Sequence, residues 1–399
     1  MANAYESNIW KFYLFRVVST LDFTVSTFVL FLLANYLSMT QVMSLQTIFV
    51  VVVLMLEVPS GVFADLVGRK LSVALAMLCA SISYVIFGFG TNYWTFLIAM
   101  VVIAFCWALR SGADSALLYD SLKELEKENQ YAKIFGRGNF YSQLTWSILA
   151  LAGGFLAIYL GYRNLFFISA FLFFLAFVIG LWFKEPPIHK KVHKKNYYKH
   201  LIEAIKFSYN HKYVKNLIIY FGLFAALGHI TWFLIQPFYE QSTFPKYIVG
   251  IAISLYFFTA GLGNLAAGKI TRRTKKNRLL ILILLIASLS FIGIFFVNKL
   301  SVLILICIIS FVCGVRDILV NKGINKHTDS HHRATVISIQ SMSRNLMYAV
   351  FAPLIGYFTD IYTPSAAFLM MGVGLFLFFV YFLILSWVSK NSLASADVV

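Results

Sequence analysis

The sequence predicts an all-α membrane protein, and three observations carry that prediction. Hydrophobic residues make up 60% of the 399 residues, charged residues make up 12%, and the mean hydropathy is +0.80. Apolar runs of about 20 residues, the length that crosses a bilayer, recur along the chain between short polar breaks. A long basic segment near the midpoint separates six such runs from six others. We therefore expect twelve transmembrane helices in two six-helix bundles.

The twelve expected helices follow one another with short connections. The first six cover roughly residues 9–37, 43–65, 72–90, 94–121, 138–159 and 164–183. The other six cover roughly residues 215–238, 246–268, 279–297, 301–321, 335–359 and 365–388. These limits predict an N-terminal bundle at 1–183, a cytoplasmic linker at 184–214 and a C-terminal bundle at 215–399. A shift of 202 residues places Gly61 on Gly263 and Gly154 on Gly356, which indicates two related halves.

The formal net charge of +17 would suggest a nucleic-acid partner in a soluble protein, so the distribution of the basic residues decides its meaning. If both termini are cytoplasmic, the inner loops hold 24 lysines and arginines and the outer loops hold three. This asymmetry fits the positive-inside rule. We therefore expect a multi-pass protein with both termini in the cytoplasm, surrounded by membrane lipids and without a nucleic-acid partner.

A charged, glycine-containing loop follows the second expected helix. It reads Gly61, Val62, Phe63, Ala64, Asp65, Leu66, Val67, Gly68, Arg69, Lys70. Gly61 allows two backbones to approach closely, and Gly68 permits a sharp turn. Asp65 places a carboxylate where the N-terminus of a packed helix would stabilise it. Arg69 and Lys70 can pair with phospholipid and carboxylates on the cytoplasmic side.

This spacing resembles the loop between helices 2 and 3 of major facilitator superfamily (MFS) transporters. The run from Glu57 to Gly61 and the stretch 111–122 resemble bacterial members of the drug-exporter type. The resemblance implies an MFS fold with pseudo-symmetric bundles, alternating access, a bacterial cytoplasmic membrane and a loop that clips the two halves together. We assign Asp120 and Arg137 to the same gating network. The chain departs from many proton antiporters, which carry Gln-Gly after the helix-4 arginine and Gly-Pro in helix 5.

Ionisable side chains inside the apolar runs are candidates for proton coupling, because each costs about 2.5 to 3.5 kcal/mol on insertion scales unless it is paired or hydrated. Asp22 has no oppositely charged neighbour one helical turn away, so it is the expected proton carrier. The alternative is a carboxylate satisfied by Ser19, Ser26 or a neighbouring helix.

Two further carboxylates could couple to protons. Arg110 and Asp114 lie four residues apart and should neutralise each other in one state of the cycle; the alternative is a static pair that fixes helix packing. Glu57 is either another proton site or an acceptor for Arg110.

The resemblance also implies a central cavity lined by helices 1, 4, 7 and 10. The candidate substrate ligands on those helices are Arg110, Trp107, His229, Trp232, Gln236 and Arg316. An aromatic cavity with few charges suits amphipathic or cationic organic molecules better than sugars.

We expect a secondary active transporter, acting as a monomer, that exports a small organic solute in exchange for protons. The first alternative is a proton-coupled importer of an anionic metabolite or nutrient, with Arg110 and Arg316 holding the anionic group. The second is a sensor or lipid-handling protein that does not transport.

The sequence carries no Gly-rich phosphate loop, nucleophile elbow or zinc-helix motif. We therefore expect no enzyme activity, no cofactor and no metal site. The histidines at 327, 331 and 332 form a cluster that we interpret as a solvated turn.

Overall fold

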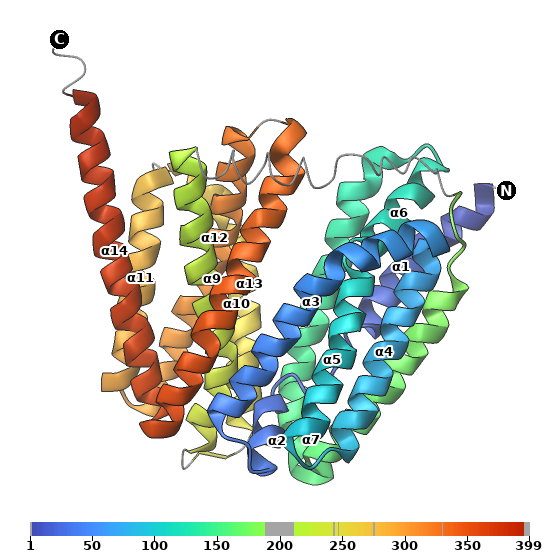
Figure 1. Cartoon of the computed structure of the whole chain (residues 1–399), viewed down its shortest axis with the longest axis horizontal. Coiled ribbons are helices and arrows are strands. Elements are labelled where there is room, and N and C mark those ends of the chain that lie inside the picture. The colour runs from blue at the N-terminus through green and yellow to red at the C-terminus, as the bar shows by residue number, and fades with distance from the viewer. Residues whose placement is uncertain are drawn as a thin grey trace. The chain divides into compact units, whose positions relative to one another are not determined.

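The computed structural model describes residues 2–187, 211–241, 244–245, 247–273, 276–328 and 330–394, and within these ranges the regular structure is helical. The chain forms two compact units (Figure 1). Unit 1 contains Met1–Asn196, Tyr239–Ser254 and Ala352–Gly356, and unit 2 contains Tyr197–Phe238, Leu255–Phe351 and Tyr357–Val399. Most of the expected linker, residues 188–210, lies outside the described residues. Its boundaries at 183 and 215 remain predictions.

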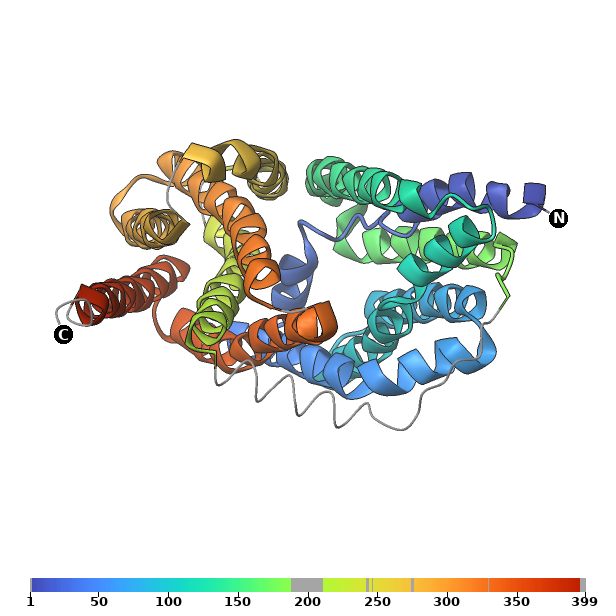
Figure 2. The same cartoon turned by 90° about the horizontal axis from the view of Figure 1, so that it is seen from above.

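The helices of unit 1 begin with α1 (Ala2–Val18) and the short α2 (Phe28–Ala34). They continue with α3 (Met39–Val67), α4 (Arg69–Phe89), α5 (Tyr93–Arg110), α6 (Ala113–Lys123), the single 3-10 turn η1 (Glu128–Gln130) and α7 (Tyr131–Trp182). Within the unit, α4 packs against α5 and α7, α3 against α5, and α1 against α7 (Figure 2).

Side-chain caps and one glycine set several helix limits in unit 1. Ser38 accepts from the backbone N–H of Gln41 at 3.2 Å while the Gln41 side chain accepts from the Ser38 N–H at 3.0 Å, a capping box that starts α3. Asn92 and Thr95 form the same box at the start of α5. Gly68 separates α3 from α4 with φ of 121°, a backbone conformation that favours glycine.

The prediction of one continuous helix at 9–37 is wrong, because residues 19–27 are not helical. Figure 2 shows this irregular stretch in dark blue between α1 and α2. Local side chains compete for the backbone there: the Thr20 hydroxyl donates to the Arg16 carbonyl at 2.9 Å, and Oδ1 of Asp22 accepts from the Thr24 N–H at 2.8 Å. Such side-chain bonds offer the backbone an alternative to the helix.

Helix α7 packs against the irregular stretch and forms a hydrogen bond with its backbone. The Phe23 N–H donates to the Ser169 hydroxyl at 3.0 Å. A Cβ built on Gly153 would lie 2.1 Å from the Phe23 carbonyl oxygen, so only glycine allows α7 to approach this closely. Non-helical backbone inside a membrane needs such partners, because lipid supplies none.

Two glycines with positive φ interrupt other expected helices. Gly112 (φ 76°) separates α5 from α6, so the prediction of one helix at 94–121 is wrong at residues 111–112. Gly161 (φ 74°) turns the chain within α7, between the spans expected at 138–159 and 164–183. Both positions use the left-handed conformation that costs glycine little.

Unit 2 is built from α9 (Lys212–Glu240), α10 (Ile248–Arg273), α11 (Lys276–Phe296), α12 (Lys299–His327), α13 (Ser330–Ile361) and α14 (Pro364–Ala394). The first residues of α10 and a short part of α13 belong to unit 1. Within unit 2, α11 packs against both α12 and α14.

Nine helices in the described part of the chain are long and apolar enough to cross a membrane. One of them, Glu128–Trp182, covers the two expected spans on either side of Gly161. The expected spans at 9–37 and 335–359 are not among the nine, and the first of these is the interrupted helix. The apolar lengths thus agree with ten of the twelve expected spans.

Candidate functional site

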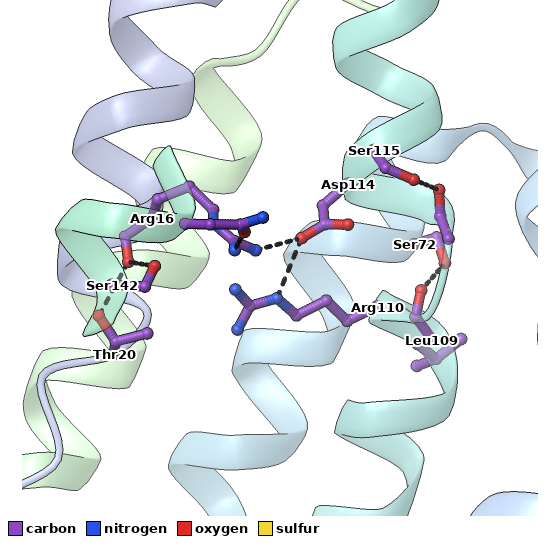
Figure 3. Close-up of polar contacts among 10 residues, drawn as sticks. Arg16, Thr20, Ser72, Leu109, Arg110, Asp114, Ser115 and Ser142 are labelled. Carbon is purple, nitrogen blue, oxygen red and sulfur yellow. Dashed lines mark hydrogen bonds and ion pairs between the residues drawn. The ribbon is translucent and has the colours of Figure 1, made fainter. Parts of the chain in front are cut away.

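Three charged side chains meet inside unit 1 (Figure 3). Oδ2 of Asp114 lies 3.0 Å from Nη1 of Arg16 and 3.4 Å from Nε of Arg110. Arg16 comes from α1, Arg110 is the last residue of α5, and Asp114 lies in the first turn of α6. We call these three residues the unit 1 cluster. It contains two guanidinium groups and one carboxylate.

The break between α5 and α6 positions this pair of opposite charges. Arg110 and Asp114 were expected on one helix face, and they do form an ion pair, but across Ser111 and Gly112 instead of along continuous helix. The break also gives Asp114 a helix N-terminus, where the dipole stabilises a carboxylate. Its residue is only 9% exposed.

Arg16 is the member of the cluster that the sequence interpretation missed. Its Nη2 donates to Oδ1 of Asn139, and its guanidinium lies 5.8 Å from the ring of Phe12 and 5.7 Å from that of Phe135. Its Nε is buried and has no acceptor among the described residues. The available signal was an arginine inside an apolar run, which carries the same cost as Asp22.

Arg110 is only partly engaged by the protein. Its Nε faces Asp114, and its guanidinium carbon lies 5.6 Å from the Phe15 ring. Within the described part of the chain its two Nη atoms have no hydrogen-bond acceptor, and Figure 3 shows them directed away from Asp114. The side chain is 20% exposed. The two NH2 groups of the guanidinium are therefore available to another molecule.

Asp22 lies in the irregular stretch of the first helix and accepts hydrogen bonds through both carboxylate oxygens. Oδ1 takes the Thr24 N–H at 2.8 Å and the Thr24 hydroxyl at 2.7 Å, and Oδ2 takes the Tyr84 hydroxyl at 2.6 Å. None of these donors carries a charge. The sequence interpretation named neither Thr24 nor Tyr84.

Of the alternative partners expected for Asp22, the neighbouring helix binds it through Tyr84 of α4, whereas Ser19 and Ser26 do not. The hydroxyls of Ser19 and Ser26 are buried and have no hydrogen-bond partner among the described residues. No lysine or arginine of that part of the chain forms an ion pair with Asp22. The carboxylate is thus held by a neighbouring helix and by its own turn.

Unit 2 contains a second buried arginine. Arg316, in α12, pairs with Oδ1 of Asp317 at 2.6 Å and packs on the rings of Phe224 at 4.8 Å and Phe221 at 5.2 Å. Arg344, in α13, interacts electrostatically with Asp317. In unit 2, one arginine pairs with Asp317 and a second interacts with it electrostatically.

The aromatic candidates of unit 2 gather around one histidine. The rings of His229 and Trp232 are stacked with centroids 5.8 Å apart, and Tyr348 of α13 lies 4.6 Å from His229. Gln236 on the same helix is fully buried. The third aromatic candidate, Trp107, lies in α5 of unit 1, is 53% exposed and contacts Phe49 edge-on.

The expected gating residues are only partly brought together. Arg69 forms an ion pair with Asp120 and donates to the Ala116 carbonyl at 3.1 Å. The carboxylate at the N-terminus of α4 is Glu185, which accepts from the backbone N–H groups of Arg69 at 2.8 Å and Lys70 at 2.7 Å. The sequence interpretation had assigned Glu185 to the linker and missed this role.

The gating candidates Asp65 and Arg137 have no such contacts within unit 1. Both are exposed, and neither side chain forms a hydrogen bond or ion pair with the described part of the unit. The proton-coupling candidate Glu57 is also exposed, and the acceptor that Arg110 finds is Asp114 instead of Glu57. Gly61 has open space where a Cβ would lie, so no backbone approaches it closely there. The histidine side chains at 327, 331 and 332 lie outside the described side chains.

Comparison with known proteins identifies the family. The family model of the Major Facilitator Superfamily matches residues 12–352, with a further match at 248–395. The chain belongs to the major facilitator superfamily. It is a multi-pass membrane protein and a secondary transporter of small molecules, and not an enzyme, as the sequence interpretation predicted.

The similarity to relatives and solved structures extends over nearly the whole chain. The MFS-type transporter YxaM of Bacillus subtilis (strain 168), which is described as uncharacterized, is 23% identical over 381 residues, 92% of each chain. A crystal structure of a mutant of the nucleoside transporter NupG matches with a TM-score of 0.83, 12% identity and coverage of 94% of this chain and 98% of that one. A bacterial homolog of the human lysosomal transporter Spinster, inward-facing and unoccupied, matches with a TM-score of 0.72, 17% identity and coverage of 96% and 95%. These structures confirm the MFS fold of two six-helix bundles.

Proposed function

We propose that this MFS transporter couples the movement of a small organic solute to the movement of protons, and that Asp22 carries the proton. The observation that supports this role is the set of partners around the Asp22 carboxylate: one tyrosine hydroxyl, one threonine hydroxyl and one backbone N–H. All three donors are neutral. A carboxylate of this kind can take up a proton without breaking an ion pair, and low dielectric disfavours its charged form.

The break in the first helix supports the same role. Discontinuous helices in transporters place irregular backbone beside the binding region, where coupling ions interact with it. Protonation of Asp22 would turn one acceptor oxygen into a hydroxyl donor and so change the hydrogen bonds that hold residues 19–27. Uptake or loss of a proton would thereby alter the geometry of the first helix.

We propose efflux in exchange for protons as the direction of transport. The resemblance of Glu57 to Gly61 and of residues 111–122 to drug exporters supports efflux. Protons would bind Asp22, with Asp114 or Glu57 as further sites, on the outer side of a bacterial cytoplasmic membrane. They would be released inward as the solute binds among His229, Trp232 and Gln236 of unit 2.

A second candidate is proton-coupled uptake of an anionic metabolite, and one observation favours it. Each unit has two arginines that interact with a single aspartate, Asp114 in unit 1 and Asp317 in unit 2. Surplus guanidinium charge inside a membrane protein suits an anionic solute.

A transport screen in proteoliposomes with an imposed pH gradient tests both candidates. The solutes should include lipophilic cations, carboxylates and nucleosides. Uphill movement of any solute that stops when the gradient is collapsed supports proton coupling, and the direction relative to the gradient separates efflux from uptake. Transport at the same rate with and without the gradient would contradict the proposal.

A further inference from the structure

The charge of the unit 1 cluster is unbalanced. Asp114 offers one negative charge, whereas Arg16 and Arg110 are permanently positive. Tyr131 of α7 also interacts electrostatically with Asp114 and Arg16 but is neutral in its ordinary form. A guanidinium group inside the membrane is costly unless an anion pairs with it. The described residues supply one such anion for two cations.

The geometry shows where a further anion would bind. Both arginines meet the same oxygen of Asp114, and Arg110 uses only its Nε to do so. Its two Nη atoms are directed away from Asp114, and the side chain remains accessible (Figure 3). Guanidinium N–H groups bind carboxylate or phosphate oxygens in pairs, which makes this edge of Arg110 suited to an acidic group.

We propose that the Nη edge of Arg110, supported by Arg16, binds the anionic group of the transported solute, and that this binding is strengthened by protonation of Asp114. When Asp114 is protonated, the cluster carries two positive charges and no negative one, so an anion is bound more tightly. By linkage, the bound anion favours protonation to the same degree. This inference rests on the proposed proton-coupled transport and favours its second candidate, because proton and anion bind together.

Three probes of nearly the same shape separate charge from packing: benzoate, benzamide and benzamidine, which are negative, neutral and positive at neutral pH. Binding to the purified full-length protein in detergent is followed by tryptophan fluorescence. We expect benzoate to bind at least about tenfold more tightly than benzamide, equivalent to about 1.4 kcal/mol. Benzamidine should bind no better than benzamide. Equal affinity for all three, or no binding by any of them, would overturn the proposal.

Two variants test the residues. Arg110→Gln should remove the preference for benzoate, whereas Arg163→Gln should keep it, because Arg163 binds the Gly88 carbonyl and Asn35 instead of the cluster. Asp114→Asn imitates the protonated carboxylate, so it should bind benzoate more tightly than the wild type at pH 7. It should also lose the increase in benzoate affinity that the wild type shows as the pH falls. Thermal unfolding confirms that each variant is folded.

The variants give independent answers. If Arg110→Gln does not fold, Asp114→Asn still decides, because weaker or unchanged benzoate binding by that variant would overturn the proposed linkage. The measurement needs no membrane and no gradient. A failure of proton-coupled transport in vesicles would therefore leave the binding result intact, and the two failures can be told apart.

Discussion

The hydroxyl of Tyr84 lies 2.6 Å from Oδ2 of Asp22, which joins the C-terminal part of α4 to the irregular stretch of the first helix. Tyr84 is buried, and its ring packs against Phe173 of α7 at 4.8 Å. The contact therefore joins the carboxylate to a side chain that is buried between α4 and α7. A change in the charge of Asp22 would therefore change a hydrogen bond to α4.

Replacing Tyr84 by phenylalanine should destabilise the protein. The change leaves Oδ2 of the part-buried Asp22 carboxyl group without this donor, and we expect a loss of about 1 to 3 kcal/mol in unfolding free energy. Denaturant titration of the purified protein measures it. Tyr159→Phe is the matched control: Tyr159 is 82% exposed, and its loss should change stability by less than about 0.5 kcal/mol. Equal effects of the two changes would contradict the role of the Tyr84 hydroxyl.

Gly153→Ala should disturb the break in the first helix. The added Cβ would lie 2.1 Å from the Phe23 carbonyl oxygen, so α7 or the irregular stretch must move. We expect a loss of about 1 to 3 kcal/mol from this overpacking, seen as a lower thermal unfolding midpoint. Gly136→Ala on the same helix is the control, because nothing lies within 4 Å of its Cβ. A Gly153→Ala protein as stable as the control would count against the close contact.

Glu185→Gln should weaken the start of α4. The Glu185 carboxylate accepts from the backbone N–H groups of Arg69 and Lys70, where the helix dipole favours a negative charge. We expect a loss of about 0.5 to 2 kcal/mol, which thermal unfolding at low salt measures, and a smaller loss at high salt. Glu128→Gln, at an exposed site without such contacts, should have no comparable effect. A loss of stability that is the same at low and high salt would argue against a charge effect.

The gating pair can be tested by a double-mutant cycle. Arg69 and Asp120 form an ion pair, so Arg69→Ala and Asp120→Ala should be non-additive, with a coupling of about 0.5 to 3 kcal/mol in unfolding free energy. Lys70→Ala and Asp120→Ala should add, since no ion pair joins those two residues within the described part of the chain. Coupling of Asp120 to Lys70 but not to Arg69 would refute this arrangement.

The sequence predicted much of the fold because bilayer thickness sets the length of a span. The wrong predictions lie where single residues determine whether the backbone is helical. Residues 19–27 read as part of an apolar run, although Ser19, Thr20, Asp22 and Thr24 are the residue types that bind their own backbone. Gly112 gave no signal that distinguished a break from an ordinary small residue.

The candidate site was predictable in part for a related reason. Asp114 and Arg110 were found because they are neighbours in sequence, four residues apart. Arg16 lies 98 residues from Asp114, and Tyr84 lies 62 residues from Asp22, so only the packing of distant helices reveals these contacts. Glu185 was missed because the predicted end of the sixth span placed it in the linker.

Gradient-driven transport by Asp22→Asn tests the central claim most directly. In proteoliposomes, the solute found by the screen is measured both for accumulation under a pH gradient and for exchange at equal pH on the two sides. We predict that Asp22→Asn loses accumulation but retains exchange, because only the proton site is removed. Accumulation by Asp22→Asn at the wild-type level would contradict the claim that Asp22 carries the proton.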